Sequence, residues 1–217
     1  MKITKLSAQE RNSERVNLYL DEKFAVGLSI NTVAKYNLFI GKEINESEYL
    51  AILHDDLGER FFNRAVDYLG SSIKTEMQIR KYLRNLLFRK KGLWYKDLDK
   101  DNSEKLLAGT MEKLAKYSYL NDEEFAEMFI ESRIKNKPRG KNVLFSELLS
   151  KGVPKEIAEK KVNELVVDEY DMLKRVYEKK YKGEKITKLD RKKIDFLLRK
   201  GFSWDLIERY IDNESEK

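Results

Sequence analysis

The stretch that decides the fold occurs twice, as LLSKGVPKEIAE at residues 148–159 and as LLRKGFSWDLIE at residues 197–208. In each copy a glycine, Gly152 or Gly201, follows an apolar helical pattern, and a Pro or Ser lies two residues further on. Gly readily adopts the left-handed conformation that ends a helix, and Ser or Pro suits the start of the next helix. Each copy is therefore predicted to be a helix, a tight turn and a second helix. A spacing of 49 residues between the copies is typical of stacked helical modules that share a core and present an extended surface.

The composition favours a helical protein and excludes several kinds of site. Charged residues make up 38% of the 217-residue chain and hydrophobic residues 41%, which suits helices with one apolar stripe. The absence of cysteine excludes disulfides and thiolate chemistry. With His54 as the single histidine, His-based metal sites and catalytic triads are almost entirely excluded. Membrane spans need about 20 consecutive apolar residues, and no run approaches that length. We expect a cytoplasmic, monomeric protein with no cofactor, no metal and no membrane segment.

The net charge of +6 is unevenly distributed. Residues 1–58 hold seven Lys/Arg and nine Asp/Glu, a balance of −2, which leaves +8 on residues 59–217. This asymmetry predicts parts with different roles, and the positive part favours a polyanion or an acidic protein as partner.

The chain is predicted to hold one small module and three helical repeats. Ile3–Leu6 is a strand candidate, and two alternating apolar stretches flank the polar turn 21–23, which predicts a β-hairpin. Separate helices are expected at 46–57 and 60–69. Further helices are predicted to begin at the caps Thr75, Asn121, Thr187 and Ser203. The predicted parts are an α+β module at 1–58 and three-helix repeats at 59–119, 120–167 and 168–217.

Four motifs in the middle of the chain resemble the signature block of the RecX family. They are YLNDEEFA at 119–126, Arg133, PRG at 138–140 and ELLSKGV at 147–153, and the first 41 residues resemble the extra N-terminal domain of longer members. The resemblance implies a mainly α fold, in which three tandem three-helix repeats form an elongated arch behind a small N-terminal α+β module. It also implies a non-enzymatic regulator of homologous recombination, DNA repair and the SOS response. Such a regulator binds the RecA recombinase and its filament on DNA and restrains ATP hydrolysis and strand exchange.

Basic side chains recur in all three repeats. Six basic residues and no acid lie between 80 and 91, six against one acid between 133 and 151, and ten against three between 174 and 193. Stacked repeats would place these clusters on related positions of one surface, able to bind DNA phosphates or acidic filament protomers. The alternative is that each cluster is an ordinary solvated helix face. The residues expected at the surface are Arg80, Lys81, Arg84, Arg133, Lys135, Arg139, Lys141, Lys151 and Lys200.

A second functional interpretation is a helical module that binds single- or double-stranded DNA directly, since Gly-turned helix pairs with basic faces also describe helix-turn-helix proteins. Aromatic residues near the basic clusters could stack on bases. We expect most of them, namely Tyr82, Phe88, Phe145 and Trp204, to be core residues, and Trp94 and Tyr95 to lie in a loop. No Gly-rich phosphate loop is present, and an enzyme is not expected.

Overall fold

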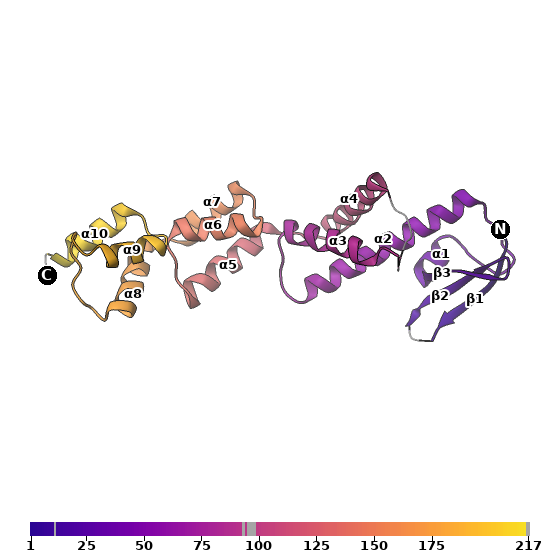
Figure 1. The fold of residues 1–217 in the computed structure, drawn as a ribbon, viewed down its shortest axis with the longest axis horizontal. Helices are drawn as coiled ribbons and strands as arrows, with labels where there is room; N and C mark the ends of the chain where they lie inside the picture. The colour runs from indigo at the N-terminus through magenta and orange to yellow at the C-terminus, as the bar shows by residue number, and fades with distance from the viewer. Residues whose placement is uncertain (11, 93, 95–98, 216–217) are drawn as a thin grey trace. The chain divides into compact units, whose positions relative to one another are not determined.

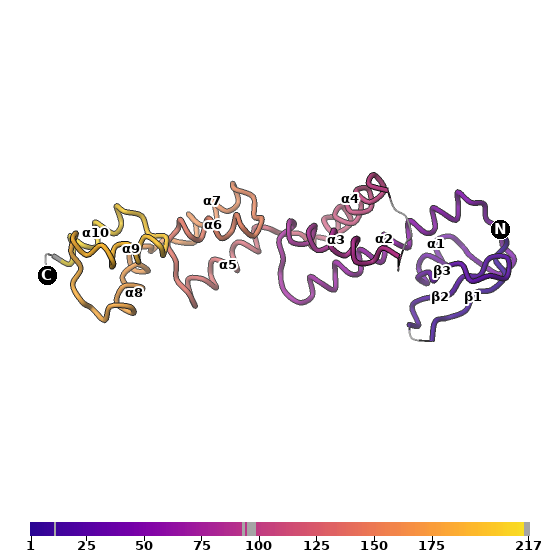
Figure 2. Tube along the Cα trace, viewed as in Figure 1, coloured from indigo at the N-terminus to yellow at the C-terminus, as the bar shows by residue number. Residues whose placement is uncertain are grey.

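The computed structural model describes residues 1–10, 12–92, 94 and 99–215. They form two compact units, one made of residues 1–71 with 82–119 and the other of residues 72–81 with 120–217. The described residues are mostly helical, with ten helices and one three-stranded sheet at the N-terminus (Figure 1). The path of the chain can be followed in Figure 2. The predicted fold class, mainly helical with a small N-terminal sheet, is confirmed.

The sheet is antiparallel in the order β1-β2-β3 and contains the predicted hairpin. Its strands are β1 (Ile3–Gln9), β2 (Asn12–Leu20) and β3 (Lys23–Ser29). Leu20 pairs with Lys23, so the turn between β2 and β3 has two central residues and not the three that the sequence predicted. These residues, Asp21 and Glu22, have φ values of 47° and 67°, as the tight turn that matches the twist of a hairpin requires.

One long helix replaces the two helices expected at 46–57 and 60–69. The helices that complete the first unit are α1 (Ile30–Lys35), α2 (Glu46–Gly70), α4 (Lys100–Lys116) and the later part of α3 (Glu76–Lys90). Helix α2 runs through Gly58, and its buried residues continue across that point from Ile52 and Leu57 to Phe61 and Ala65. This unbroken apolar stripe keeps the helix intact, because one internal Gly costs only about 1 kcal/mol. His54 is therefore an exposed mid-helix residue.

A buried carboxylate ties the sheet to α2. The Asp56 side chain is only 4% exposed, and it accepts hydrogen bonds from Arg15 (3.1 Å), Arg60 (2.8 Å) and the backbone N–H of Ser29 (2.6 Å). Both arginines also donate to the carbonyl of Gly27. Burial lowers the pKa of Arg60, and the neighbouring Asp56 opposes that shift. Because a buried charge is tolerated only when it is paired, these bonds fix how the sheet packs on the helix.

Replacing the buried carboxylate should unfold the protein more easily. Asp56→Asn keeps the size of the side chain but leaves two buried cations without a counter-charge, so we expect a loss of about 3 kcal/mol or more in unfolding free energy. Urea unfolding followed by far-UV circular dichroism measures it. The matched control is Asp67→Asn on the same helix, whose side chain is 69% exposed and 3.7 Å from Arg64. That control should cost less than about 1 kcal/mol. Equal losses would contradict a special role for Asp56.

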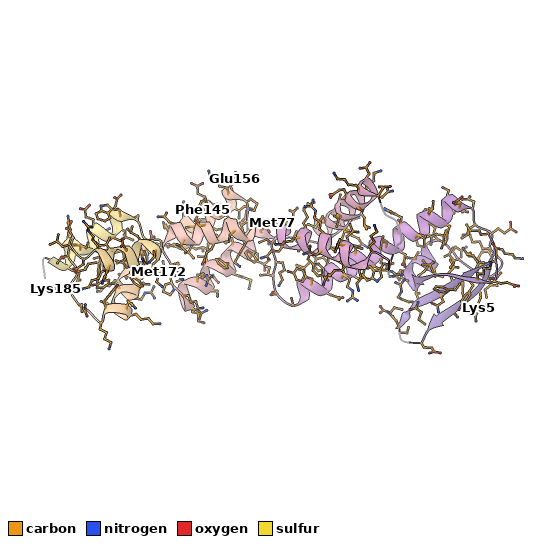
Figure 3. The ribbon with its side chains drawn as sticks, in the orientation of Figure 1. Lys5, Met77, Phe145, Glu156, Met172 and Lys185 are labelled. Carbon is orange, nitrogen blue, oxygen red and sulfur yellow. The ribbon has the colours of Figure 1, made fainter. Side chains whose placement is uncertain are left out.

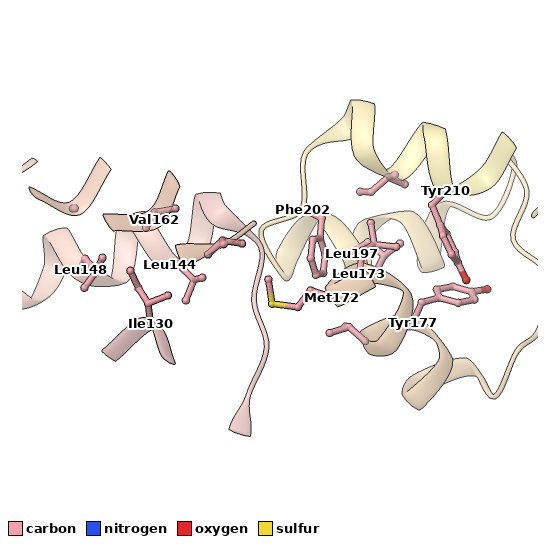
Figure 4. Packing of buried hydrophobic residues seen from close by; sticks show 14 of the residues in the cluster. Ile130, Leu144, Leu148, Val162, Met172, Leu173, Tyr177, Leu197, Phe202 and Tyr210 are labelled. Carbon is pink, nitrogen blue, oxygen red and sulfur yellow. The ribbon is translucent and has the colours of Figure 1, made fainter. Parts of the chain in front are cut away.

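The second unit holds the first part of α3 and, among the described residues, six complete helices around one core. They are α5 (Asp122–Asn136), α6 (Lys141–Lys151), α7 (Lys155–Leu165), α8 (Glu169–Tyr181), α9 (Arg191–Arg199) and α10 (Trp204–Ser215). Its buried residues form a single cluster that runs from Phe125 to Ile211 (Figure 4). The caps at Asn121, Ser203 and Thr75 are confirmed by side chain–backbone hydrogen bonds. The cap at Thr187 is wrong, because Thr187 instead donates to Asp190, and α9 begins after Asp190.

The two glycines of the repeated stretch end their helices as predicted. Gly152 and Gly201 both have φ of 92°. After Gly152, the N–H of Val153 donates to the carbonyl of Leu148 (3.1 Å), while the N–H of Gly152 itself donates to Leu149 (2.9 Å). The same pair of bonds recurs around Gly201. This is the Schellman arrangement, which satisfies the last carbonyls of a helix and needs a left-handed residue.

Each of these turns also docks on the start of an earlier helix. The carbonyl of Lys151 accepts a hydrogen bond from the hydroxyl of Thr75 (2.7 Å), at the start of α3. The carbonyl of Lys200 accepts one from the N–H of Gly140 (2.9 Å), at the start of α6. The approach is close, because a Cβ on Gly152 would lie 2.4 Å from the Cβ of Met77 (labelled in Figure 3). The Lys–Gly turn therefore forms a similar contact twice within this unit. We call the contact at Gly152 the first junction and the contact at Gly201 the second junction.

A carboxylate completes each junction. The N–H of Glu76, in the first turn of α3, donates to Asp122 at the start of α5 (2.9 Å). The N–H of Lys141, in the first turn of α6, donates to Glu169 at the start of α8 (2.8 Å). First-turn N–H groups have no partner within their own helix, and a carboxylate there is also favoured by the helix dipole. Helix α3 and helix α6, each the middle helix of a three-helix repeat (below, a triplet), are thus capped by residues of the next triplet.

Replacing Gly201, at the second junction, should lower the unfolding free energy more than replacing Gly183, which has a similar left-handed conformation but no close neighbours. Gly183→Ala is the control, since Gly183 has φ of 80° with nothing within 4 Å of an added Cβ. It should cost only left-handed strain, about 1–2 kcal/mol. An added Cβ on Gly201 would lie 2.6 Å from the backbone nitrogen of Val143. Gly201→Ala should therefore cost about 1–3 kcal/mol more than the control. Thermal and urea unfolding of both variants measure the difference, and equal losses would show that the junction is not tightly packed.

Within the described residues, no helix has both the length and the apolar character needed to cross a membrane.

Candidate partner-binding surface

The predicted basic residues fall into those paired with carboxylates and those that are not. Arg84, in the first unit, lies 3.6 Å from Glu104. In the second unit Arg80 pairs with Glu76 at 2.9 Å, one helical turn away, while Lys81 is exposed. Exposed pairs of this kind contribute little to stability, and the carboxylates reduce the positive field that a partner would meet.

Arg133 and Lys151 are brought together around one aromatic ring. The guanidinium of Arg133 donates to Glu147 through Nε (2.8 Å) and an Nη (3.2 Å), which joins α5 to α6. Arg133 and Lys151 lie 5.0 Å and 5.2 Å from the centre of the Phe129 ring, within the range of cation–π attraction. Arg133 thus holds two helices together as well as carrying charge.

Arg139 and Lys200 meet at the second junction. Arg139 lies between Pro138 and the docked Gly140, whose N–H donates to the carbonyl of Lys200. The Nε of Arg139 is buried and has no hydrogen-bond partner among the described residues. The pKa of Lys200 is lowered, chiefly by burial and further by the nearby charges of Arg139 and Lys180.

Lys135 and Lys141 complete the predicted set. Lys135 is exposed near the end of α5. Lys141 is half-buried beside a shallow hollow of about 320 Å³ that Phe145, labelled in Figure 3, also lines. Neither lysine has a carboxylate within 4.0 Å of its ammonium group among the residues that the structure describes.

The aromatic residues differ from the sequence prediction. Phe88 and Trp204, expected in the core, are 83% and 48% exposed. Trp94, expected to be available in a loop, packs edge-to-face on Phe61 at 5.9 Å. Tyr82 stacks on Tyr68 as a partly buried residue. The prediction for Tyr95 lies outside the described residues.

Lys180 is not singled out by the sequence. It belongs to the basic stretch 174–193, where nothing local distinguishes it from its neighbours. Its charge contributes to the lowered pKa of Lys200, an effect of the folded chain that no local pattern indicates.

The arrangement can bind anionic groups by charge and hydrogen bonding. Its cations are lysines and arginines at helix ends and turns, which suit phosphate or carboxylate oxygens. Among the residues that the structure describes, no group of three or more His, Cys, Asp or Glu side chains is placed to hold a metal ion.

Comparisons with known proteins agree with this architecture. Family models match the regulatory protein RecX N-terminal domain at residues 1–45, the second RecX three-helix domain at 121–161 and the third at 168–211. The chain is 32% identical over 214 residues to the regulatory protein RecX of Bacillus velezensis, covering 97% of this chain and 76% of that protein. It is 31% identical over 217 residues to that of Clostridium tetani, covering 97% and 93%.

Solved structures show the same fold. A crystal structure of regulatory protein RecX matches with a TM-score of 0.74 and 23% identity over 98% of both chains. The crystal structure of RecX from Lactobacillus salivarius matches with a TM-score of 0.59 and 24% identity, covering 75% of this chain and 99% of that one. With two relatives above 30% identity, of which it covers 76% and 93%, and three matching domain models, this chain belongs to the RecX family of regulatory proteins.

Proposed function

We propose that this protein binds the filament that the RecA recombinase forms on DNA and inhibits its ATPase and strand exchange, acting in the cytoplasm without catalysing a reaction. The observation that supports the proposal best is the junction that recurs at Gly152 and Gly201. The two junctions are alike in their turn geometry and place helix starts of the second unit in a repeating relation to the turns that follow them. Repeated units of this kind suit a partner whose own subunits repeat.

The proposed mechanism is a shift of populations. A regulator that contacts neighbouring protomers stabilises whichever filament state presents the better-matched contacts. If that state is the one inactive in ATP turnover, hydrolysis and strand exchange fall together. We propose that each of the triplets at 59–119, 120–167 and 168–217 makes a separate contact with the filament. The protein would act as a monomer, with the module at 1–58 at its N-terminus.

A second candidate function is direct binding of nucleic acid. It is favoured by the exposed Trp204 and Phe88 and by the cations that lack carboxylate partners at the second junction. Exposed aromatic side chains can stack on bases next to phosphate-binding cations. A titration against naked single-stranded DNA and against recombinase-coated DNA, at several salt concentrations, separates the two functions. Filament binding that is equal to or weaker than binding to naked DNA would contradict the first proposal.

Charge reversal at Lys135 and Lys141, two lysines whose ammonium groups form no ion pair among the described residues, should weaken regulation. We expect Lys135→Glu combined with Lys141→Glu to lower the apparent affinity for the filament roughly tenfold, because each exposed contact contributes about 1 kcal/mol or less. The measurement is the DNA-dependent ATPase rate of the recombinase as a function of regulator concentration, at physiological salt.

The matched control is Lys23→Glu combined with Lys116→Glu. Both control lysines are exposed residues of the first unit, and the change in net charge is the same. The control should inhibit like the unchanged protein, and circular dichroism should show equal helicity in both variants. Equal inhibition by both double variants would place the interface away from Lys135 and Lys141. A protein that leaves the ATPase rate unchanged at every concentration would contradict the proposed function itself.

A further inference from the structure

A cavity of about 400 Å³ lies in the first unit, between α1, α2 and α4. The residues that line it fall within 31–35, 54–59 and 105–113, and all of these segments belong to the same unit. The three helices are labelled in Figure 1. The lining residues His54 and Gly109 are exposed, so the cavity is open to solvent and a partner can reach it.

The inner part of the cavity suits an apolar group. Its buried lining residues are Thr32, Leu106 and Thr110. The hydroxyl of Thr110 donates to the carbonyl of Leu106 at 2.8 Å. The hydroxyl of Thr32 donates to the Glu59 carboxylate at 3.3 Å. Both hydroxyl donors are therefore used, and a polar ligand group placed here would lose its bonds to water without replacement.

Two glycines in the middle of helices leave this space open. Gly58 lies in α2 and Gly109 in α4, and both line the cavity. A Cβ on Gly109 would have nothing within 4 Å, and one on Gly58 would make only an ordinary contact with Leu106 at 3.7 Å. Glycine within a helix is less stable than alanine, so the packing of this unit requires neither glycine. What the two glycines provide is room for a group from outside.

The two carboxylates that line the cavity already have partners. Asp55 accepts hydrogen bonds from the ammonium of Lys35 and from the hydroxyl of Tyr36, the latter at 2.7 Å. Glu59 accepts one from the side-chain amide of Asn31 at 2.7 Å. The α2 side of the cavity is therefore satisfied and does not need a cation from a partner.

The α4 side of the cavity carries cations without such partners. Lys105, Gly109 and Lys113 are spaced four residues apart, so they share one face of the helix, with each lysine about 6 Å along the axis from the glycine. Among the described residues neither lysine has a carboxylate within 4.0 Å of its ammonium group. The ammonium of Lys113 lies 4.2 Å from the centre of the Phe62 ring. The free charge of the cavity is thus positive on both sides of Gly109.

We propose that the cavity between α2 and α4 binds an acidic segment of a protein partner. One bulky apolar side chain of that segment fills the space over Gly58 and Gly109. Carboxylates on both sides of that apolar residue, one helical turn away or two residues away in a strand, pair with Lys105 and Lys113. A buried apolar anchor inside a charged rim is the usual arrangement of a strong protein–protein contact.

The site rests on the proposed function, in which the partner is the recombinase filament, and it supplies the contact of the triplet at 59–119. A nucleic-acid strand fits the cavity less well. Its closely spaced phosphates would pass the carboxylates of Asp55 and Glu59, which line the same cavity.

Filling the cavity should weaken binding without weakening the fold. Gly109→Leu places a bulky side chain where a Cβ has nothing within 4 Å, and Leu favours a helix more than Gly does. We expect an unchanged or higher melting temperature and a loss of filament affinity of about tenfold or more, measured by co-sedimentation with the recombinase on single-stranded DNA. The matched control is Ala108→Leu, at the neighbouring exposed residue outside the lining. A folded Gly109→Leu variant that binds as tightly as the control would overturn the proposal.

Charge reversal tests the acidic character of the partner segment. Lys105→Glu combined with Lys113→Glu should also lower filament affinity about tenfold, since two contacts of about 1 kcal/mol or less are lost. The control is Lys23→Glu combined with Lys100→Glu, two exposed residues of the same unit outside the lining. Equal affinities of the two double variants, both with unchanged helicity, would overturn the acidic assignment.

Thiol protection locates the contact directly, because the chain has no cysteine of its own. Gly109→Cys and the control Ala108→Cys are alkylated briefly, and peptide mass spectrometry gives the rate for each thiol. Excess filament should slow alkylation at position 109 about tenfold or more and leave position 108 nearly unchanged, since a covered thiol reacts only when the contact opens. Equal rates at both positions, with co-sedimentation showing that the filament holds the protein, would overturn the site alone. Failure of the unchanged protein to co-sediment would instead contradict the proposed function. Protection by DNA and nucleotide without recombinase would identify a different ligand and overturn the assignment to a protein segment.

Discussion

The structure of the second unit depends on one contact, the docking of a Lys–Gly turn on the first turn of an earlier helix. The turn ends its own helix with a left-handed glycine, and the preceding carbonyl, at Lys151 or Lys200, accepts a hydrogen bond from the earlier helix. The donor is the hydroxyl of Thr75 at the first junction and the backbone N–H of the buried Gly140 at the second, which would otherwise lack an acceptor. A Cβ on Gly201 would clash with the backbone of Val143, and one on Gly152 would clash with the side chain of Met77. The same residue therefore ends a helix and allows two triplets to pack as one core.

This constraint also determines which charges meet. Docking places Arg139 beside Lys200, although repulsion between cations disfavours the arrangement, and the backbone contacts at Gly140 hold it. At the first junction Lys151 lies against Phe129 with Arg133, whose charge Glu147 balances. The two junctions thus share their backbone geometry but differ in electrostatics, since only the second leaves a buried donor unsatisfied.

The sequence predicted the features that depend on local physics. Preferences of a few adjacent residues explain the helix ends at Gly152 and Gly201 and the caps at Thr75 and Ser203. They also explain the hairpin whose turn comes before Lys23. Features set by distant partners were not predictable. Helix α2 is continuous because its apolar stripe packs across Gly58, and the buried Asp56 is acceptable only with Arg15 and Arg60. The basic residues were identified as a class, but their sorting into paired and unpaired cations required the packing of α5, α6 and α8.

Amide hydrogen exchange tests the docking contact most directly. The N–H groups of Glu76 and Lys141 lie in the first turn of their helices, where exchange is normally fast, but the structure bonds them to Asp122 and Glu169. Lys192 also lies in the first turn of a helix, as the second residue of α9. The docking account predicts that Glu76 and Lys141 exchange slower than Lys192 by on the order of tenfold or more, corrected for intrinsic rates. Exchange of all three amides at similar corrected rates would contradict it.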